Sequence, residues 1–231
     1  MAYQLDCYIQ LTGVVHCQTG LRIGGNKEEI EIGGMDNPII RHPVTKHPYI
    51  PGSSLKGKLR SLLEYKHGKV GDRGKPCGCL KADCPICPMF GPHIQGNKQS
   101  HALGPTRIIL RDAMIRQESI DLLEPLMDEG IHYTEVKTEN IIDRSTGKAA
   151  DHGLRTQERV PAGTEFDFEL VLRVFEGDDA QKMLGDVADA LRMLEKDYLG
   201  SSGSRGYGQV TITGLQKDGV AQPNWREEGL A

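Results

Sequence analysis

The stretch EFDFELVLRV (residues 165–174) alternates apolar residues with mostly polar ones. A period of two residues over this length predicts a half-buried β-strand. Its inward face would carry Phe166, Phe168, Leu170, Leu172 and Val174. Residues 178–200 then change to helical spacing, with an apolar stripe made of Met183, Leu184, Val187, Leu191 and Leu194. QVTIT (209–213) predicts a further strand, so this part of the chain has the order strand, helix, strand.

The N-terminal part shows the same order. LDCYIQLTGVV (5–15) predicts a strand whose buried face carries Leu5, Cys7, Ile9 and Leu11. PGSSLKGKLRSLLEYKHG (51–68) predicts a helix with Ser53 or Ser54 as its N-cap. The buried stripe of that helix would be Leu55, Leu59, Leu62 and Leu63. TRIILRDA (106–113) predicts a short buried strand.

Two strand–helix–strand units predict an α+β fold with a ferredoxin-like (RRM-like) core. We expect a single domain over residues 1–231, with its core at about 1–67, 105–130 and 163–215. Residues 68–104, rich in Gly, Pro and Cys, predict a structured insertion. Residues 131–162 predict a hairpin with a polar tip around 145–147.

Composition excludes several classes of protein. Charged residues make up 26% of the chain and hydrophobic residues 38%, which is typical of a folded domain and not of a disordered chain. No apolar run approaches the length of a membrane span, and the first residues lack the regions of a signal peptide. We therefore expect a cytoplasmic protein without a membrane partner.

Charge is distributed unevenly along the chain. The formal net charge is −4, but residues 41–75 hold nine Lys or Arg and two acids, a local charge of +7. Residues 112–198 hold ten basic residues and 21 acids, a local charge of −11. A basic patch on an acidic protein favours a polyanionic partner, although the charges alone fit an ordinary solvated helix face.

The segment CGCLKADCPIC carries the strongest local motif, four cysteines spaced C-x-C-x4-C-x2-C. Four thiolates this close can surround one tetrahedral ion, so we expect structural Zn²⁺ bound by Cys77, Cys79, Cys84 and Cys87. Two alternatives are an iron–sulfur cluster, which uses the same ligands, and four free thiols without a metal. His93 could also replace one of the cysteines as a ligand. We expect Cys7 and Cys17 to be core or strand-end residues.

Two further segments suit phosphate. The start of the 51–68 helix offers unpaired N–H groups and the hydroxyls of Ser53 and Ser54, and Lys56 and Arg60 extend positive charge along it. GSSGSRGYGQV (200–210) runs from helix into strand, the reverse of nucleotide-binding loops, so it is either a linker or a backbone surface for phosphates.

Aromatic residues make up only 5% of the chain, and TRIILRD lacks the aromatics with which RNA-recognition sheets stack bases. Any nucleic acid would then be read through phosphates and sugars, independently of sequence. A protein that holds a guide RNA needs this property, because base pairing supplies the specificity.

The loop GGMDNP (33–38) places a lone acid, Asp36, between glycines and a proline. Such a carboxylate usually belongs to a solvated turn. Together with GSSLKGKLR, CPICPMFG and GSRGYGQV, however, GGMDNPIIRHPVTKHPYIP resembles the repeated backbone subunit of type III-A CRISPR effectors, the Csm complex, within the RAMP superfamily. The resemblance runs nearly end to end, with these motifs in the expected order.

The resemblance implies a RAMP palm stacked in several copies along a CRISPR RNA, with other effector subunits and a complementary single-stranded target RNA as partners. The 131–162 hairpin would be the thumb that displaces a base at regular intervals. Asp36 would cleave the target with Mg²⁺ or another divalent ion, and His16, near the RNA, would be a second candidate catalytic residue. We assign the guide to Arg22, Ser53, Ser54, Lys56, Arg60 and the loop residues Gly203, Ser204, Arg205, Gly206, Tyr207 and Gly208.

Two alternatives stay open at this point. A non-catalytic guide-binding scaffold would use the same surface without Asp36. A metal-independent RAMP endonuclease would process the precursor guide with histidine, for which His16, His42 and His47 are candidates.

Overall fold

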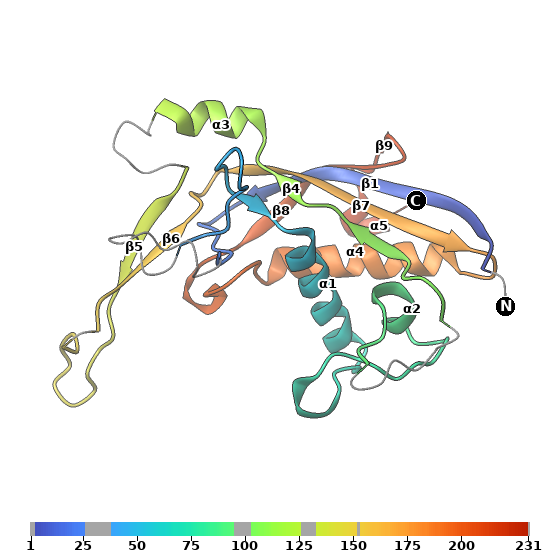
Figure 1. The fold of residues 1–231 in the computed structure, drawn as a ribbon, viewed down its shortest axis with the longest axis horizontal. Helices are drawn as coiled ribbons and strands as arrows, with labels where there is room; N and C mark the ends of the chain where they lie inside the picture. Colours follow the sequence, from blue (N-terminus) through green and yellow to red (C-terminus); the bar gives the residue numbers. More distant parts are fainter. Residues whose placement is uncertain (1–2, 26–37, 95–102, 126–132, 152, 231) are drawn as a thin grey trace.

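The computed structural model describes residues 3–25, 38–94, 103–125, 133–151 and 153–230, and its centre is an antiparallel sheet (Figure 1). The sheet has the strand order β3-β7-β1-β8-β9. Its strands are β1 (Leu5–Cys17), β3 (Ile108–Leu110), β7 (Glu165–Phe175), β8 (Val210–Lys217) and β9 (Val220–Ala221). The fold is therefore mixed α and β with an antiparallel sheet, as the sequence predicts.

The alternating apolar residues of β7 and β1 form the centre of the core. Leu170 lies opposite Leu11, and Phe166 lies opposite Val15, and all four side chains are fully buried. Such cross-strand apolar pairs stabilise neighbouring strands and fix their register. The predicted inward set of the 165–174 strand is buried throughout: Phe166, Phe168, Leu170, Leu172 and Val174.

The start of β1 differs from the prediction. Leu5 and Cys7 are exposed, although the sequence assigns both to the face that carries Leu11, and the pairing of β1 with β7 shifts register between them. The reason is that β8 pairs with β1 only from Leu11 onward, so the first half of β1 forms an uncovered edge. Cys17, at the other end of the strand, is fully buried, as expected.

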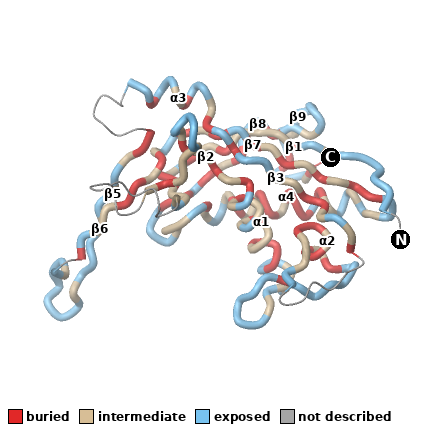
Figure 2. Tube along the Cα trace, viewed as in Figure 1, coloured by how far each residue is buried: buried red, intermediate tan, exposed pale blue. Residues whose placement is uncertain are grey.

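Two helices, α1 (Gly52–Lys66) and α4 (Ala180–Lys196), pack against each other on one side of the sheet (Figure 1). The predicted apolar stripe of α1 is confirmed, since Leu55, Leu59, Leu62 and Leu63 are all buried. In the predicted stripe of α4, Leu184, Val187, Leu191 and Leu194 are buried and Met183 is partly buried. Figure 2 shows this burial along the faces where helices and sheet meet. The helices thus supply the second layer of the core.

The N-cap of α1 is not a serine, contrary to the prediction. The helix begins at Gly52, and the Gly52 N–H donates to the Asp112 carboxylate at 2.7 Å. Ser53 and Ser54 therefore lie inside the first turn. Asp112 follows β3 in the chain and splits the predicted 106–113 strand into β3 and β4.

The remaining elements surround this core. β2 (Tyr49–Ile50) pairs with β4 (Ala113–Met114). β5 (Glu135–Glu139) and β6 (Arg155–Arg159) form an antiparallel pair whose connection protrudes from the body (Figure 1). The short helices are η2 (Asp72–Gly74), α2 (Cys87–Phe90), α3 (Gln117–Leu123), η4 (Gly203–Arg205) and α5 (Trp225–Glu228). Among the described helices, none has the length and apolarity that a bilayer crossing requires.

Candidate RNA interface and metal centre

The four clustered cysteines converge on one point in the insertion. The Sγ atoms of Cys77, Cys79, Cys84 and Cys87 all lie within 4.8 Å of one another. Three of the separations are 3.9 Å (Cys77–Cys84), 3.8 Å (Cys79–Cys87) and 3.7 Å (Cys87–Cys77). A tetrahedral ion with Zn–S bonds of about 2.3 Å requires sulfur–sulfur separations of roughly 3.8 Å. The four side chains therefore fit a metal ion, and no replacement by His93 is needed.

Backbone groups support the thiolate form of this cluster. The N–H groups of Ile86 and Cys87 point at the Cys84 sulfur, at 3.4 and 3.5 Å. Burial raises the pKa of Cys87 to about 12. Burial acts in the same direction on Cys79, but N–H donation from Lys81 and the neighbouring thiols bring the pKa of Cys79 down to about 7. Metal binding requires all four thiolates, so it would release protons here.

The glycine-rich loop 200–208 lies against the segment that carries Arg22. The Arg22 guanidinium donates to the Ser201 hydroxyl at 2.9 Å, and the Ser201 N–H donates to the Arg22 carbonyl at 2.9 Å. Gly208 has a φ of +71°, and a Cβ there would lie 2.0 Å from the Leu199 carbonyl oxygen. Only glycine fits this turn, so the loop has a defined shape. Arg22, Gly203, Ser204, Arg205 and Gly206 share one neighbourhood as a result, with Ser204, Arg205 and Gly206 exposed.

Tyr207 differs from its neighbours in the loop, because only 1% of its surface is exposed. Two cations of the β5–β6 pair lie over its ring, Lys137 at 4.5 Å and Arg159 at 4.8 Å from the ring centroid. Burial, followed by the nearby Glu139 carboxylate, raises the Tyr207 pKa. Tyr207 therefore joins the glycine-rich loop to the base of the hairpin and is not part of an open RNA surface.

The start of α1 offers the expected open surface. Ser53 is exposed, and Ser54 and Lys56 are partly exposed. Burial lowers the pKa of Lys56, and the positive charges of Arg60 and Arg173 lower it further. Neighbouring cations that depress a lysine pKa indicate a concentrated positive potential.

Gly57 leaves additional room beside Lys56. Apart from its chain neighbours and the backbone of its own helix, a Cβ built at Gly57 meets no atom of the described chain within 4 Å. A glycine inside a helix costs about 1 kcal/mol relative to alanine. An external ligand that approaches the helix closely at this position would account for it.

Arg60 has two partners within the chain. Its Nε donates to the Glu64 carboxylate at 2.8 Å, and its Nη2 donates to the Cys77 carbonyl at 2.7 Å. The side chain is 17% exposed. The expected guide contact is therefore already engaged with the metal-binding insertion.

Asp36 lies outside the described residues, and hydrogen bonds join the described residues on the two sides of its segment. Gly25 N–H donates to the Pro38 carbonyl at 3.1 Å, and the Ile40 N–H donates to the Ile23 carbonyl at 2.9 Å. These bonds bring the two flanks of the 26–37 segment together. In the sequence, Asp36 lies only two positions before Pro38.

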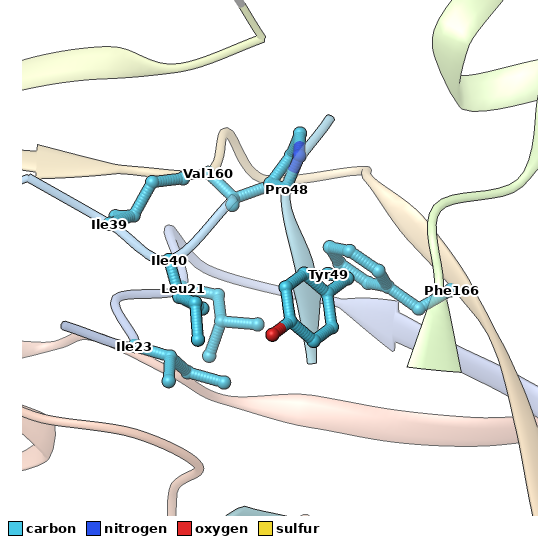
Figure 3. A pocket seen from close by; sticks show the side chains of 8 residues that line it. All are labelled: Leu21, Ile23, Ile39, Ile40, Pro48, Tyr49, Val160 and Phe166. Atoms are coloured by element: carbon cyan, nitrogen blue, oxygen red, sulfur yellow. The ribbon is translucent and has the colours of Figure 1, made fainter. Parts of the chain in front are cut away.

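The same flanks pack over an apolar pocket (Figure 3). Side chains from both flanks gather on one side of it, and the Tyr49 and Phe166 rings lie on the other. The lining residues are Leu21, Ile23, Ile39, Ile40, Pro48, Tyr49, Val160 and Phe166. Apolar packing thus fixes both ends of the segment to β2 and β7.

A buried carboxylate that the sequence analysis missed holds the C-terminal flank. Glu158 of β6, 7% exposed, accepts the Ile39 N–H at 2.7 Å and the Arg41 guanidinium at 2.5 Å. The Thr134 hydroxyl donates to the same carboxylate at 2.8 Å. This network ties the hairpin to the flank of the Asp36 segment. Sequence carried no signal for it, because its members lie far apart and β6 has no apolar period.

His16 lies on β1, one position out of phase with the core residues Val15 and Cys17. It therefore faces the side of the sheet away from the core. Its Nδ1 is 3.3 Å from the Glu165 carboxylate, which also accepts the Arg116 guanidinium at 3.0 Å. The structure places His16 in an ion-pair cluster, and its position relative to Asp36 falls outside the described residues.

Comparison with known proteins gives consistent findings. A family model described as the RAMP superfamily matches residues 14–211. A protein of Methanothermobacter thermautotrophicus named "CRISPR system Cms endoribonuclease Csm3" is 44% identical over 217 residues, which cover 89% of this chain and 84% of that protein. A protein of Methanocaldococcus jannaschii with the same name is 42% identical over 223 residues, covering 95% and 83% of the two chains.

A solved structure is similar over the same length. It is described as the Csm3–Csm4 subcomplex in the type III-A CRISPR-Cas interference complex. The matched chain is 28% identical, with a TM-score of 0.58, and the match covers 97% of this chain and 86% of that one.

Proposed function

This chain belongs to the RAMP superfamily and, within it, to the Csm3 family of CRISPR endoribonucleases, and on that basis we propose that it is a backbone subunit of a type III-A CRISPR effector that cleaves target RNA. The observation that carries the proposal is identity of 44% and 42% to named endoribonucleases over nearly the whole chain. The reaction would take place in the cytoplasm, within a complex that contains other type III-A subunits. Copies of this chain would line up along one guide RNA.

The palm of this subunit would be ferredoxin-like. The order β3-β7-β1-β8, with α1 and α4 as the two crossover helices on one side, supports that assignment. The β5–β6 pair with its protruding connection would be the thumb. Exposed apolar side chains near its end, Ile141, Ile142 and Leu154, support contact with another molecule.

The guide would lie along the start of α1 and the glycine-rich loop. Ser53, Ser54 and Lys56 supply hydroxyls and charge, and Arg22 and Arg205 belong to the second surface. These groups suit phosphates and sugars, so the guide would bind independently of its sequence. Arg60 and Tyr207 would support these surfaces from within, given their contacts inside the chain.

The insertion would contain a structural zinc ion held by Cys77, Cys79, Cys84 and Cys87. The sulfur separations of 3.7 to 3.9 Å support this donor set. Four sulfur ligands leave no open position for substrate, so this ion would stabilise the insertion and take no part in cleavage.

Asp36 would act on the target strand where the thumb displaces a nucleotide. Displacement lets the backbone relax toward in-line geometry, in which the 2′-hydroxyl can attack the adjacent phosphorus. Asp36 would orient that hydroxyl, the 5′-oxygen would leave, and His16 would remain in its ion-pair cluster with Glu165 and Arg116. A divalent ion bound by Asp36 and RNA phosphates would stabilise the developing negative charge.

The test uses the assembled complex and two end-labelled RNAs, a complementary target and a precursor guide. We expect regularly spaced cuts in the target only, loss of cutting with EDTA and recovery with added Mg²⁺. A complex with Asp36→Ala should load guide and bind target normally but leave the target intact.

Each alternative predicts a different pattern of cleavage products on the gel. A scaffold predicts the same target pattern from wild-type and Asp36→Ala complexes. A histidine-dependent processing enzyme predicts cleavage of the precursor that survives chelation. Either pattern would contradict the proposed function.

A further inference from the structure

A buried ion pair on α1 forms hydrogen bonds to the backbone of the first cysteine of the metal centre. Glu64, 5% exposed, accepts the Cys77 N–H at 2.8 Å with the same oxygen that binds Arg60 Nε. Arg60 Nη2 donates to the Cys77 carbonyl at 2.7 Å. Both peptide groups flanking the Cys77 Cα are thus bound by two side chains one helical turn apart.

We propose that Arg60 and Glu64 are positioning residues of the cysteine metal centre, and that Arg60 is not a contact to RNA. The inference rests on the zinc centre of the proposed function. It assigns a role to Glu64 that neither the charge pattern nor the comparisons give. The Arg60 charge would then have a role different from that of the other cations at the start of α1.

The geometry supports this role in three ways. Glu64 and Cys77 are 13 positions apart, so their bond fixes the entry of the insertion onto a rigid helix. A buried carboxylate is costly without a partner, and Arg60 is that partner. An ion with four thiolates carries a net negative charge, which the nearby guanidinium would partly offset.

The expected magnitude follows from other metal sites. Hydrogen-bonding partners that orient metal ligands typically change metal affinity by about 10- to 100-fold when removed. Removing the Glu64 carboxylate should have a larger effect than neutralising it, because glutamine keeps an acceptor for the Cys77 N–H.

The experiment measures zinc affinity of the full chain by competition with a chromophoric chelator. We expect Glu64→Ala and Arg60→Ala to weaken zinc binding by about 10- to 100-fold, and Glu64→Gln by less. Lys56→Ala, one turn earlier on the same helix, is the matched control and should bind zinc like the wild type. Co²⁺ absorption of each variant reports whether four sulfurs still ligate the ion.

The RNA arm repeats guide binding with zinc kept saturating. Arg60→Ala should keep the wild-type salt slope, whereas a direct phosphate contact would lower it by about 0.7. A lowered slope, or unchanged zinc affinity in both Glu64→Ala and Arg60→Ala, would overturn the inference while leaving the zinc centre and the proposed function intact. Wild-type protein without bound metal would overturn the inference together with the zinc centre, but not the cleavage by Asp36.

Discussion

At the residue scale, burial separates two side chains that the sequence places on the same proposed guide surface. Lys56 keeps a partly exposed ammonium near other cations, and Gly57 leaves open space beside it. Tyr207 is almost fully buried, with Lys137 and Arg159 over its ring. A ring that is almost fully buried cannot stack on a base, so the loop would meet RNA through its exposed glycine, serine and arginine groups.

Lys56→Ala should weaken guide binding for all RNA sequences alike. One lost phosphate contact on single-stranded RNA lowers the slope of log affinity against log salt by about 0.7. Filter binding of unrelated guides over a salt series measures this slope. Val44→Ala, a change at an 80% exposed uncharged residue, serves as control. A loss that depends on RNA sequence would count against a phosphate contact.

At the scale of elements, the insertion would depend on a bound metal, because it contains little regular secondary structure of its own. Within its described residues, 68–94 and 103–104, the regular structure amounts to η2 and the four-residue α2, and the first cysteine is hydrogen-bonded to α1. The buried residues Ile86, Met89 and Phe90 pack beside the cysteines. Small segments of this kind gain much of their folding energy from a bound ion.

Cys84→Ser with Cys87→Ser should remove the zinc and loosen the insertion. We expect close to one equivalent of zinc in wild-type protein and none in the double variant, by elemental analysis. Amide exchange should rise strongly in residues 76–94 and little in β1 and β7, which pair with each other along most of their length. A serine change at the exposed Cys7 is the matched control. A zinc-free wild-type protein purified without chelator would refute the site.

Local periodicity explains which elements could be predicted from the sequence. β7, α1 and α4 carry complete apolar patterns, and the four cysteines lie within eleven residues. The α1 cap could not be predicted, because Asp112 reaches Gly52 from 60 positions away. The exposure of Cys7 depends on where β8 stops pairing, and the Glu158 network joins three separate segments. These features are properties of the tertiary structure and leave no local pattern.

At the scale of the whole molecule, the hairpin is firmly held at its base and free at its end. Tyr207 and Glu158 connect it to the glycine-rich loop and to the flank of the Asp36 segment. Its far part exposes Ile141, Ile142 and Leu154, by 48%, 55% and 64%. The base would therefore transmit the thumb's position to the cleavage segment, while the end meets RNA.

Shortening the hairpin should separate guide binding from cleavage. Replacement of residues 140–154 by Asn-Gly joins Glu139 directly to Arg155, the last pair of β5 and β6, through a turn suited to a two-residue loop. The base contacts of Tyr207 and Glu158 remain, so folding and guide loading should be preserved. Without the protruding part of the hairpin, no target nucleotide would be displaced, and the cutting rate should fall by about 100-fold or more. Time courses on end-labelled target with assembled complexes measure this rate, with the Asp36→Ala complex giving the background.

A full-length variant with Ile141→Ser, Ile142→Ser and Leu154→Ser distinguishes the length of the hairpin from its apolar contacts. Regular cutting at the wild-type rate by the shortened complex would show that the hairpin does not set the cleavage geometry.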